Sequence, residues 1–454
     1  MSKDLDIVIF GAAGFTGRRT ATRIARNPPT IQGFKWAIAS RVEDQKLLED
    51  LLKEIQSTHA PNSGVSIPEI IIANAKSHDE LLNFTKRAKV VINAVGPFRY
   101  FGLNVATACV EGRADYVDCC GEPEFYDRVF LNCNKAAREN GVTIVHASGW
   151  DSVPADLGVL ACKLEFAKRG GVCNAVEMFH SLQYGPLGFA LNYATYESAV
   201  QGFAHRKELG KLRKALSGVR PNLPRLGEKL KINSTPGHFD KRIGLACMVF
   251  PGSDASCVKM GQQVVQMNRE AGSASQALAG IPAVEFSAYL AAWTRTVYQV
   301  VGYAAFDSIL ASYTWGRKLL LDYPYLFTQG IFSKTRPPNE KMIHDTSFTS
   351  TFLANGYSDP AAVKTAGKVN KPNMFVKMSV TGPEPAYVFT PIALACSAYT
   401  LLEQKSSIPA GVNSPASAFA DTAIFDRFRG FGIKWSIHEV KTTHVPETFV
   451  GARL

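Results

Sequence analysis

The sequence lacks the short motifs that mark many hydrolases and metal enzymes. It contains no H-E-x-x-H, no G-x-S-x-G and no C-x-x-C pair among its nine cysteines. An odd number of cysteines without paired spacing argues against a zinc site and a disulfide framework, and it fits a reducing compartment. We therefore expect no metal. The adjacent Cys119 and Cys120 are either redox-active or small buried thiols.

A leader, an internal repeat and an uninterrupted apolar run are also missing. The first core strand begins by Ile7, which leaves no space for the apolar core of a signal peptide or for an Arg- and Ser-rich transit arm. The long apolar stretch 281–310 contains Glu285, Arg295 and Asp307, so we expect a buried or amphipathic helix there and not a transmembrane one. These observations predict an intracellular protein without a cleavable leader.

What is present is the composition of a globular protein. The 454 residues are 46% hydrophobic and 20% charged, which suffices for two or three domains with full cores. The net charge of +11 is compatible with nucleic acid, an anionic membrane or an anionic substrate, and does not choose among them. Because no recognised nucleic-acid-binding module accompanies this charge, we expect no nucleic-acid partner.

The first seventeen residues contain the pattern around which the chain is organised. A short apolar strand over 6–10 and a helical stretch over 18–25 flank three glycines spaced as G-x-x-G-x-x-G. Glycine suits such a turn because a Cβ atom would keep the backbone away from a pyrophosphate, which the helix N-terminus attracts. The alternative is an ordinary glycine-rich turn. We predict that a dinucleotide is bound by Gly11, Ala13, Gly14, Phe15, Thr16 and Gly17.

Strands and helices alternate through the first third of the chain. Further strands are predicted over 34–40, 68–73, 90–95, 116–120 and 142–147. Helices are predicted over 44–57, 77–87, 103–111 and 124–140. Apolar strands that alternate with helices indicate a parallel sheet covered on both faces. We predict an α/β fold whose first domain, residues 1–156, is a doubly wound Rossmann domain.

The end of the second strand bears on which dinucleotide binds. An NAD enzyme usually has Asp or Glu there, whereas this strand ends in Ser40 and Arg41. A guanidinium can hold a 2′-phosphate by paired hydrogen bonds, and a carboxylate would repel it. The sequence therefore favours NADP(H), with NAD(H) possible and a solvated surface arginine as the alternative reading.

Further polar and turn residues follow neighbouring strands. Ligands of open α/β sheets bind beyond the carboxyl ends of the strands, so Asn74 after the third strand is a candidate to face the adenine. Val95, Gly96 and Pro97 close the fourth strand and are candidate cofactor contacts. Each of these segments is also compatible with a simple turn.

After the sixth strand the sequence reads Gly149-Trp150-Asp151-Ser152-Val153-Pro154. Asp151 or Ser152 as N-cap, with Pro154 in the first turn, is good chemistry for starting a helix. The functional reading places this loop beside the nicotinamide with Asp151 orienting the substrate. Asp151 is therefore a catalytic candidate.

Together these motifs resemble the saccharopine dehydrogenase-like oxidoreductases. The resemblance rests on the order of five segments: 10–17, 95–98, 121–123, 149–156 and 382–391. It implies a nicotinamide cofactor, a central α+β domain over 157–390, and a C-terminal segment over 391–454 that returns to the Rossmann domain. It also implies relatives that are saccharopine dehydrogenases, trans-acting enoyl reductases, and lipid-droplet or mitochondrial membrane-associated proteins.

The resemblance implies an oxidoreductase but leaves its substrate open. Hydride transfer between NAD(P) and an imine or secondary amine, as in lysine metabolism, is the first hypothesis. An NADPH-dependent enoyl or keto reductase of lipid metabolism is the second, and a cofactor-binding scaffold on lipid surfaces without turnover is the third. For saccharopine, Arg99 and Arg206 are candidates to pair with its carboxylates, and Tyr193 is a further catalytic candidate.

A basic segment over 205–231 has nine Lys or Arg residues against two Glu. It is either a solvated surface or, together with the aromatic-rich stretch 281–310, a peripheral site for an anionic lipid surface. A homodimer is a further possibility for the partners.

The remainder of the chain is less regular. We expect a strand over 175–182, a helix from Tyr196 to Leu209, a helical 348–354 and a strand over 374–381. We also expect a helix over 390–403, a loop over 408–418 and a strand near 433–437 that packs on the first domain.

Overall fold

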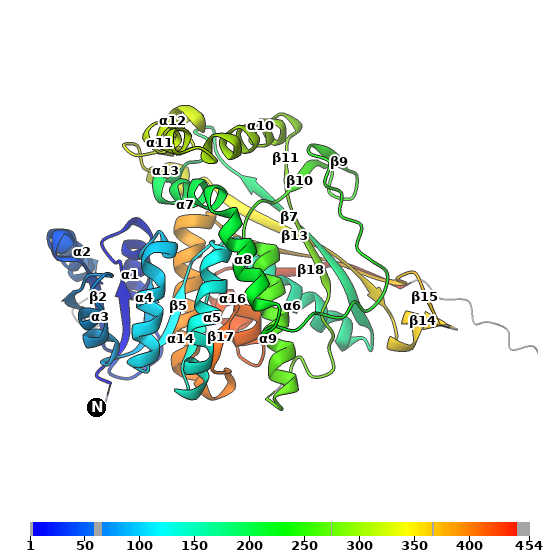
Figure 1. Ribbon diagram of the computed structural model, residues 1–454, viewed down its shortest axis with the longest axis horizontal. Coiled ribbons are helices and arrows are strands. Elements are labelled where there is room, and N and C mark those ends of the chain that lie inside the picture. The colour runs from blue at the N-terminus through cyan, green and yellow to red at the C-terminus, as the bar shows by residue number, and fades with distance from the viewer. Residues whose placement is uncertain (1–2, 59–65, 274, 366, 443–454) are drawn as a thin grey trace, which may run out of the picture.

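The first domain of this computed structural model is a seven-stranded parallel sheet with helices on both faces (Figure 1). The structure describes residues 3–58, 66–273, 275–365 and 367–442. Along the sheet the order is β17-β6-β5-β4-β1-β2-β3, so the strand order reverses beside β1 as in a doubly wound fold. Its strands are β1 Leu5–Phe10, β2 Trp36–Ser40, β3 Glu69–Ile72, β4 Ala88–Asn93, β5 Asp115–Asp118, β6 Thr143–Val145 and β17 Gly411–Asn413.

Alternating residues of β1 explain why helices cover both faces. Ile7 and Ile9 belong to one apolar cluster with α1 and α14, whereas Val8 and Phe10 belong to a second cluster with α3, α4 and α5. The helices of this domain are α1 Phe15–Arg26, α2 Gln45–Thr58, α3 His78–Thr85, α4 Phe98–Glu111, α5 Pro123–Glu139 and α14 Thr390–Gln404. The prediction of a Rossmann-type α/β fold is confirmed.

A second seven-stranded sheet is mixed and lies against α6 and α9. Its order is β18-β16-β13-β7-β11-β10-β9, with β7 and β11 parallel and the other neighbours antiparallel. Its strands are β7 Val172–Gln183, β9 His238–Asp240, β10 Leu245–Val249, β11 Glu285–Ala292, β13 Ser347–Tyr357, β16 Met374–Pro383 and β18 Lys434–Thr442. The two helices are α6 Ser152–Lys168 and α9 Asp254–Glu270. A small hairpin, β14 Lys364–Thr365 and β15 Lys368–Val369, projects from the end of this sheet (Figure 1).

Several helices form a cap above the two sheets (Figure 1). α10 packs against both α7 and α11, and a small two-stranded sheet of β8 and β12 joins the base of the cap. The cap elements are α7 Tyr193–Ala204, α10 Thr294–Ala311, α11 Thr314–Asp322, α12 Pro324–Phe327, α13 Glu340–His344, β8 Leu191–Asn192 and β12 Phe332–Ser333. Helix α8 Arg206–Leu216 leaves the cap and packs on α5.

The last segment of the chain contributes to both sheets. α14 packs beside α1 and against β4 and β5 of the parallel sheet, and β17 pairs with β6 at the edge of that sheet. Strand β18 pairs instead with β16, so the strand expected near 433–437 belongs to the mixed sheet and not to the parallel sheet. Two short helices, α15 Pro415–Phe419 and α16 Ile424–Gly430, connect these strands. The boundaries 1–156, 157–390 and 391–454 stay a prediction, and residues 443–454 lie outside the described residues.

Three other sequence expectations need correction. Residues 348–354 are not helical but belong to β13, where Phe348, Phe352 and Ala354 enter the core. The stretch 281–310 is not one helix: its first part is core strand β11, and α10 starts only after Trp293. The expected loop 408–418 contains β17 and most of α15.

One further boundary differs. The helix expected from Tyr196 to Leu209 starts at Tyr193 and breaks at His205 into α7 and α8. A single helical segment of the described chain, Pro385–Ser407, is apolar and long enough to cross a membrane. It contains α14, and 83% of its most apolar window is buried inside the fold, as expected for a core helix.

Candidate functional site

The glycine loop brings β1, β2 and β4 together at one edge of the parallel sheet. The backbone nitrogens of Gly11 and Ala12 donate to Ala39 O over 2.8 and 3.1 Å, and Ala94 N donates to Phe10 O over 2.8 Å. Gly11 has φ +91°, and a Cβ atom there would come within 2.9 Å of Ala94. The close approach of these strand ends therefore requires glycine.

Gly14 and Gly17 keep the turn tight where α1 begins. A Cβ atom on Gly17 would lie 2.1 Å from Gly11 O, and one on Gly14 would lie 3.2 Å from the same oxygen. Gly14 is the N-cap of α1 and makes no side-chain cap, and the first turn holds no acidic residue. The free N–H groups and the positive end of the helix dipole therefore stay available to a pyrophosphate. This cradle fits a dinucleotide.

Phe15 and Arg19 connect the start of α1 to a distant segment. The Phe15 ring packs edge-on against Tyr387 at a centroid distance of 4.6 Å, and the Arg19 guanidinium lies 4.8 Å from the Phe15 ring centroid. Glu384 accepts hydrogen bonds from three backbone nitrogens of the Tyr387 turn. The Tyr387 oxygen accepts a hydrogen bond from Asn192 N at the start of the cap. Tyr387 therefore joins the glycine loop to the cap, a role that the sequence analysis missed.

The end of β2 presents both a cation and a carboxylate. Arg41 is 63% exposed, and its Nε lies 3.0 Å from Asp44 and 4.0 Å from Glu43. Asp44 also accepts a hydrogen bond from Ser40 Oγ over 2.9 Å. Because the Asp44 contact uses Nε, it orients the guanidinium without occupying its two terminal nitrogens. Asp44 lies four residues beyond the strand end, where the sequence analysis did not look for a carboxylate.

Asn74 lies at the carboxyl end of β3, on the same sheet edge, and is exposed. Its side-chain oxygen accepts a hydrogen bond from Lys76 N, and its backbone nitrogen donates to Glu80. The turn reading therefore holds for Asn74, and its contact with an adenine stays a prediction.

The Asn93 side chain fixes the start of the segment after β4. Val95 N donates to Asn93 Oδ1 over 3.0 Å, and Asn93 donates in turn to the Tyr116 hydroxyl over 2.9 Å. The Gly96–Pro97 peptide bond is cis, and a Cβ atom on Gly96 would meet nothing within 4 Å. Val95 thus stands next to Gly11, with Gly96 and Pro97 directly after it in the chain, and the contact of these three residues with the cofactor stays a prediction.

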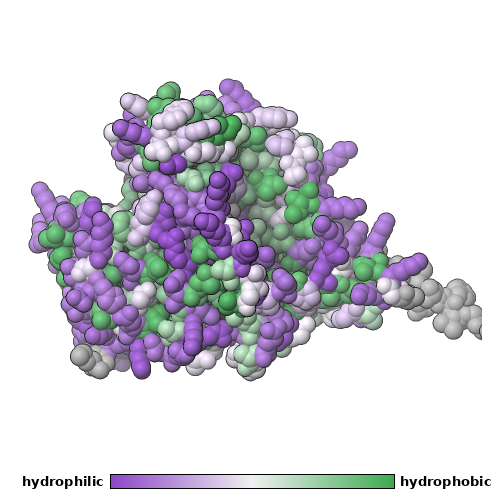
Figure 2. Space-filling view, viewed as in Figure 1, coloured by the Kyte–Doolittle hydropathy of each residue, from purple (hydrophilic) through white to green (hydrophobic). Residues whose placement is uncertain are grey.

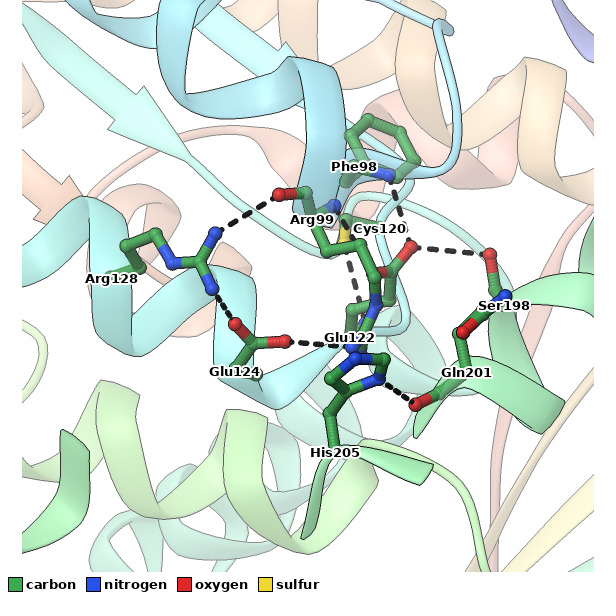
Figure 3. Close-up of polar contacts among 9 residues, drawn as sticks. All are labelled: Phe98, Arg99, Cys120, Glu122, Glu124, Arg128, Ser198, Gln201 and His205. Carbon is green, nitrogen blue, oxygen red and sulfur yellow. Dashed lines mark hydrogen bonds and ion pairs between the residues drawn. The ribbon is translucent and has the colours of Figure 1, made fainter. Parts of the chain in front are cut away.

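Glu122 holds the next turn, at the start of α4 (Figure 3). Its carboxylate accepts hydrogen bonds from Phe98 N at 3.1 Å and from Arg99 N and Nε at 3.2 Å. It also accepts one from Ser198 Oγ of α7 at 3.1 Å. Glu122 therefore joins the loop after β4 to the cap. Sequence spacing alone did not single it out, because its partners lie far along the chain.

Arg99 is not available to a substrate. It is buried, and its guanidinium is paired with Glu122 at 3.2 Å and with Glu124 at 3.0 Å (Figure 3). Glu124 is paired with Arg128 as well. The hypothesis that Arg99 pairs with a substrate carboxylate is wrong, because its charge is already neutralised. Arg206 lies exposed on α8, with its guanidinium 5.1 Å from the Phe203 ring centroid.

Asp151 lies beyond the end of β6, where residues of three elements form a polar cluster. It is the N-cap of α6, and its Oδ1 accepts hydrogen bonds from Ser152 N at 2.5 Å and Ser152 Oγ at 2.9 Å. Ser253 Oγ lies 3.4 Å from both of its carboxylate oxygens. Its φ of 76° is unusual for a residue with a side chain. The cap reading is therefore correct, and the strained backbone is typical of a functional position.

The cluster continues through Asp254 and His180. His180 Nε2 lies 3.0 Å from Asp254 Oδ2, and its Nδ1 lies 2.7 Å from Ser350 Oγ. Trp150 packs on the His180 ring at a centroid distance of 4.8 Å. Asp254 Oδ1 and Trp150 Nε1 are buried and have no hydrogen-bond partner among the described residues.

Burial sets the protonation of this cluster. It raises the pKa of Asp254 to about 8. Burial, with Asp254 nearby, raises the pKa of Asp151 to about 7, and burial lowers the pKa of His180 to about 4. At neutral pH His180 is thus neutral and Asp254 largely protonated, so the Asp254 hydroxyl donates to His180 Nε2. Two neighbouring carboxyls with raised pKa values can hold and release a proton near neutral pH.

The other candidates lie outside this cluster. Tyr193 begins α7, and the Lys334 ammonium lies 5.0 Å from its ring centroid. Burial raises the pKa of Tyr193 to about 12, and among the described residues no hydrogen bond or ion pair joins it to Asp151. Burial also raises the pKa of Cys119 to about 12, which favours the inert-thiol reading over the redox one. Within the ranges that the structure describes, no three His, Cys, Asp or Glu side chains are placed to share a metal ion.

The structure thus brings together Gly11, Gly14, Gly17, Val95 and Gly96 around one loop, with Arg41 on the neighbouring strand end. Asp151 stands at the same sheet edge, beyond β6. The structure does not bring Asp151 and Tyr193 together, and the Arg99 guanidinium is occupied by its ion pairs with Glu122 and Glu124.

Comparison with known proteins places the chain among dehydrogenase relatives. Residues 7–145 match the family model described as the saccharopine dehydrogenase NADP binding domain. A saccharopine dehydrogenase-like oxidoreductase of Mus musculus is 36% identical, with 95% of this chain and 96% of the relative covered. A lipid droplet localized protein of Caenorhabditis elegans is 31% identical, over 95% of this chain and 98% of the relative. Apo saccharopine dehydrogenase (L-Glu forming) from Saccharomyces cerevisiae has a similar fold, with TM-score 0.55, 12% identity and coverage of 96% and 100%.

Proposed function

Because the chain belongs to the saccharopine dehydrogenase-like oxidoreductase family and is an NAD(P)-dependent oxidoreductase, we propose that its cofactor is NADP(H), bound at the β1–α1 turn. The single observation that carries the proposal is the cradle of Gly11, Gly14 and Gly17 with Arg41 on the neighbouring strand end. The helix N-terminus attracts the pyrophosphate, and the terminal nitrogens of Arg41 pair with the 2′-phosphate. Asp44 positions Arg41 for this contact.

The bound nicotinamide supplies the hydride, and the protein positions the substrate and supplies a proton. We assign the proton to Asp151, because it stands at the same sheet edge as the glycine loop and its pKa of about 7 lets it be protonated near neutral pH. Asp254, with a pKa of about 8, is placed to hold a second proton behind it. A hydride and a proton together reduce a polarised double bond.

Two substrate classes fit this chemistry. One is an imine or secondary amine of the saccharopine type, and the other is an enoyl or keto group of a lipid intermediate. A saccharopine-type substrate carries several carboxylates, and the pairing of Arg99 with Glu122 and Glu124 removes one cation that would recognise them. This argues for the less charged lipid-type substrate.

A substrate assay separates the two classes. Purified full-length protein with NADPH is incubated with saccharopine-forming substrates, then with enoyl and keto thioesters, while nicotinamide absorbance is followed. We expect turnover with a thioester and loss of that turnover in Asp151→Asn, with NADPH binding retained. Tight NADPH binding without turnover on any candidate would contradict catalysis and would favour a cofactor-binding scaffold.

A second candidate function, docking on a lipid surface, is favoured by the cap. Of the 24 large hydrophobic side chains that are exposed in the described chain, ten lie between residues 293 and 326. Figure 2 shows pale and green side chains gathered over α10–α12 at the top of the molecule. The most exposed are Trp293 at 77%, Leu326 at 72% and Trp315 at 63%, with the cations Arg295 and Lys318 also exposed among them. Aromatic side chains flanked by cations are typical of interfacial segments.

Flotation with anionic liposomes tests this candidate. We expect wild-type protein to float in a salt-sensitive manner, and Trp315→Glu with Leu326→Glu to stay at the bottom. Leu131→Glu with Val369→Glu, which replaces exposed hydrophobic residues elsewhere, is the matched control. Equal flotation of both double variants would remove the cap as the docking face.

Location and assembly stay expectations. The name of the Caenorhabditis elegans relative supports association with lipid droplets, and a mitochondrial location remains the alternative. A homodimer also stays a prediction.

A further inference from the structure

A second polar site lies on the mixed sheet, apart from the glycine loop. A groove of about 590 Å³ opens between the β9–β10 hairpin and the chain before it, and residues of β7 and β13 form its floor. This is the size of a pocket for a small organic ligand. β9 and β10 lie at the far end of the sheet from β18 (Figure 1).

Lysines from three separate segments meet at this groove. Lys229 and Lys231 come from the basic segment 205–231, Lys241 from the hairpin, and Lys371 from the turn before β16. None of the four forms an ion pair among the residues that the structure describes. All four side chains are exposed, and an anion bound among them would be stabilised because it offsets the repulsion between their like charges.

The acidic side chains of the groove do not cancel these lysines. Glu177 and Asp240 are both paired with Arg242, at 2.5 and 2.7 Å. These three side chains together carry one net negative charge. Glu228 is the third carboxylate. The lining as a whole carries five cations against three carboxylates.

The floor offers a hydrogen-bond acceptor. Asn174 is buried, and its Nδ2 donates to Glu228 O over 2.8 Å. Its Oδ1 is buried without a partner among the described residues. A buried acceptor that lacks a donor is costly, and a hydroxyl group of a ligand would satisfy it.

We propose that this groove binds a phosphate ester that carries a free hydroxyl group, with the phosphate held by the four lysines and the hydroxyl donating to Asn174. The phosphate comes either from a soluble polyol phosphate or from the headgroup of a phospholipid. The second source has support in position, because the exposed Phe239 lines the groove. The groove also lies close to the cap that we propose for lipid docking. Gly237, next to the hairpin, approaches the Tyr298 ring of α10 so closely that a Cβ atom on it would lie 2.8 Å from that ring.

Binding measurements on the full chain test the groove. Glycerol 3-phosphate, ethyl phosphate and inorganic phosphate are the soluble probes, and phosphatidylcholine vesicles with and without phosphatidylglycerol are the lipid probes. We expect glycerol 3-phosphate to bind more tightly than ethyl phosphate, which lacks the free hydroxyl. Lys241→Glu with Lys371→Glu should weaken binding by roughly tenfold or more, since two attractive charges become repulsive.

The matched control is Lys86→Glu with Lys135→Glu, which makes the same charge change on exposed positions of the first domain. Loss of only the soluble probes in the groove variant identifies a metabolite site, and loss of only the vesicles identifies a headgroup site. Equal binding by the groove and control variants, or no binding of any probe to wild type, overturns the proposal.

Two further measurements distinguish failure of the groove proposal from failure of the cofactor site. NADPH binding, measured in the same samples, should be unchanged in the groove variant, so failure of the groove and failure of the cofactor site are distinguishable. In wild-type protein, glycerol 3-phosphate should protect Lys241 and Lys371 from acetylation as followed by mass spectrometry. Absence of this protection, with saturable binding elsewhere, also contradicts the groove.

Discussion

The β1–α1 turn and the Asp151–Asp254–His180 cluster lie on the same protein but are built in opposite ways. The turn is made by seven consecutive residues, in which Gly14 and Gly17 leave room for Gly11 O and Gly11 leaves room for Ala94 just after β4. The cluster takes Asp151, His180 and Asp254 from three elements of the chain. Its properties arise from burial and proximity, which only the folded chain creates.

The comparison teaches where each kind of site is vulnerable. The turn depends on the absence of side-chain atoms, so adding a single methyl group should destroy it. The cluster depends on the charge of groups that are costly to bury, so a neutral group of the same shape should improve stability.

The largest effect is expected at Gly17. In Gly17→Ala the added Cβ would lie 2.1 Å from Gly11 O, so α1 must move away from the loop and NADPH affinity should fall by about 100-fold or more. Gly14→Ala, whose Cβ would lie 3.2 Å from the same atom, should lose less. Gly210→Ala on the exposed α8 is the control, since nothing lies within 4 Å of its Cβ. Nucleotide fluorescence gives the affinities, and equal binding by all three variants would contradict the cradle.

The next effect is on stability at the cluster. A carboxyl whose pKa is raised in the folded state binds a proton that the unfolded chain has lost, so its stabilising contribution falls as the pH rises from about 4 to about 8. Asp254→Asn removes this penalty and its amide can still donate to His180. We expect the variant to gain on the order of 2 kcal/mol over wild type at pH 8, and to gain little near pH 4.

Urea unfolding at several pH values measures this gain, with Asp50→Asn on the exposed face of α2 as the control. A gain that is independent of pH, or the same in the control, would show that Asp254 is ionised without penalty in the folded protein.

A third change sharpens the role of the β2 end. Arg41→Asp replaces the cation by a carboxylate that repels a 2′-phosphate and accepts hydrogen bonds from ribose hydroxyls, so NADPH affinity should fall by about 10- to 100-fold while NADH affinity rises. Asp44→Asn removes the charge of the nearer carboxylate, leaves Glu43 at 4.0 Å from Arg41 Nε, and should change the preference only slightly. Titrations with both nucleotides decide between the solvated arginine and the phosphate-binding one.

The smallest effect is expected at the bond between the cap and the first domain. Ser198→Ala removes the hydroxyl that donates to Glu122 Oε1 at 3.1 Å, and should cost about 1–2 kcal/mol of folding stability while leaving NADPH affinity within about threefold. Ser308→Ala on α10, whose hydroxyl bonds only to its own helix, is the control. A larger loss of affinity than of stability would make Ser198 part of the cofactor site.

Six strands of the parallel sheet were predictable because each is a short, largely apolar run between turn residues, whereas β17 fell in an expected loop. The glycine loop, the Asp151 cap and helix α14 were also predictable, because each is determined by residues that are close together in the sequence. The mixed sheet was harder to predict from the sequence. Residues 348–354 look helical in isolation, and only the pairing of β13 with β7 and β16 makes them a strand.

The partners of charged residues were the least predictable part. Arg99 looked available to a substrate until Glu122, 23 residues away, was found to neutralise it. Asp254 and His180 carried no motif, and their significance comes from burial beside Asp151. Sequence spacing reports on backbone geometry nearby, whereas protonation and ion pairing depend on neighbours that are distant in the chain.

The most direct test of the account is titration of the purified wild-type protein with NADPH and with NADH, followed by nucleotide fluorescence. We expect saturable binding of both or of NADPH alone, with NADPH the tighter ligand. Failure of either nucleotide to bind would show that the glycine loop is only a turn, and would contradict the assignment of this edge of the sheet as the cofactor site.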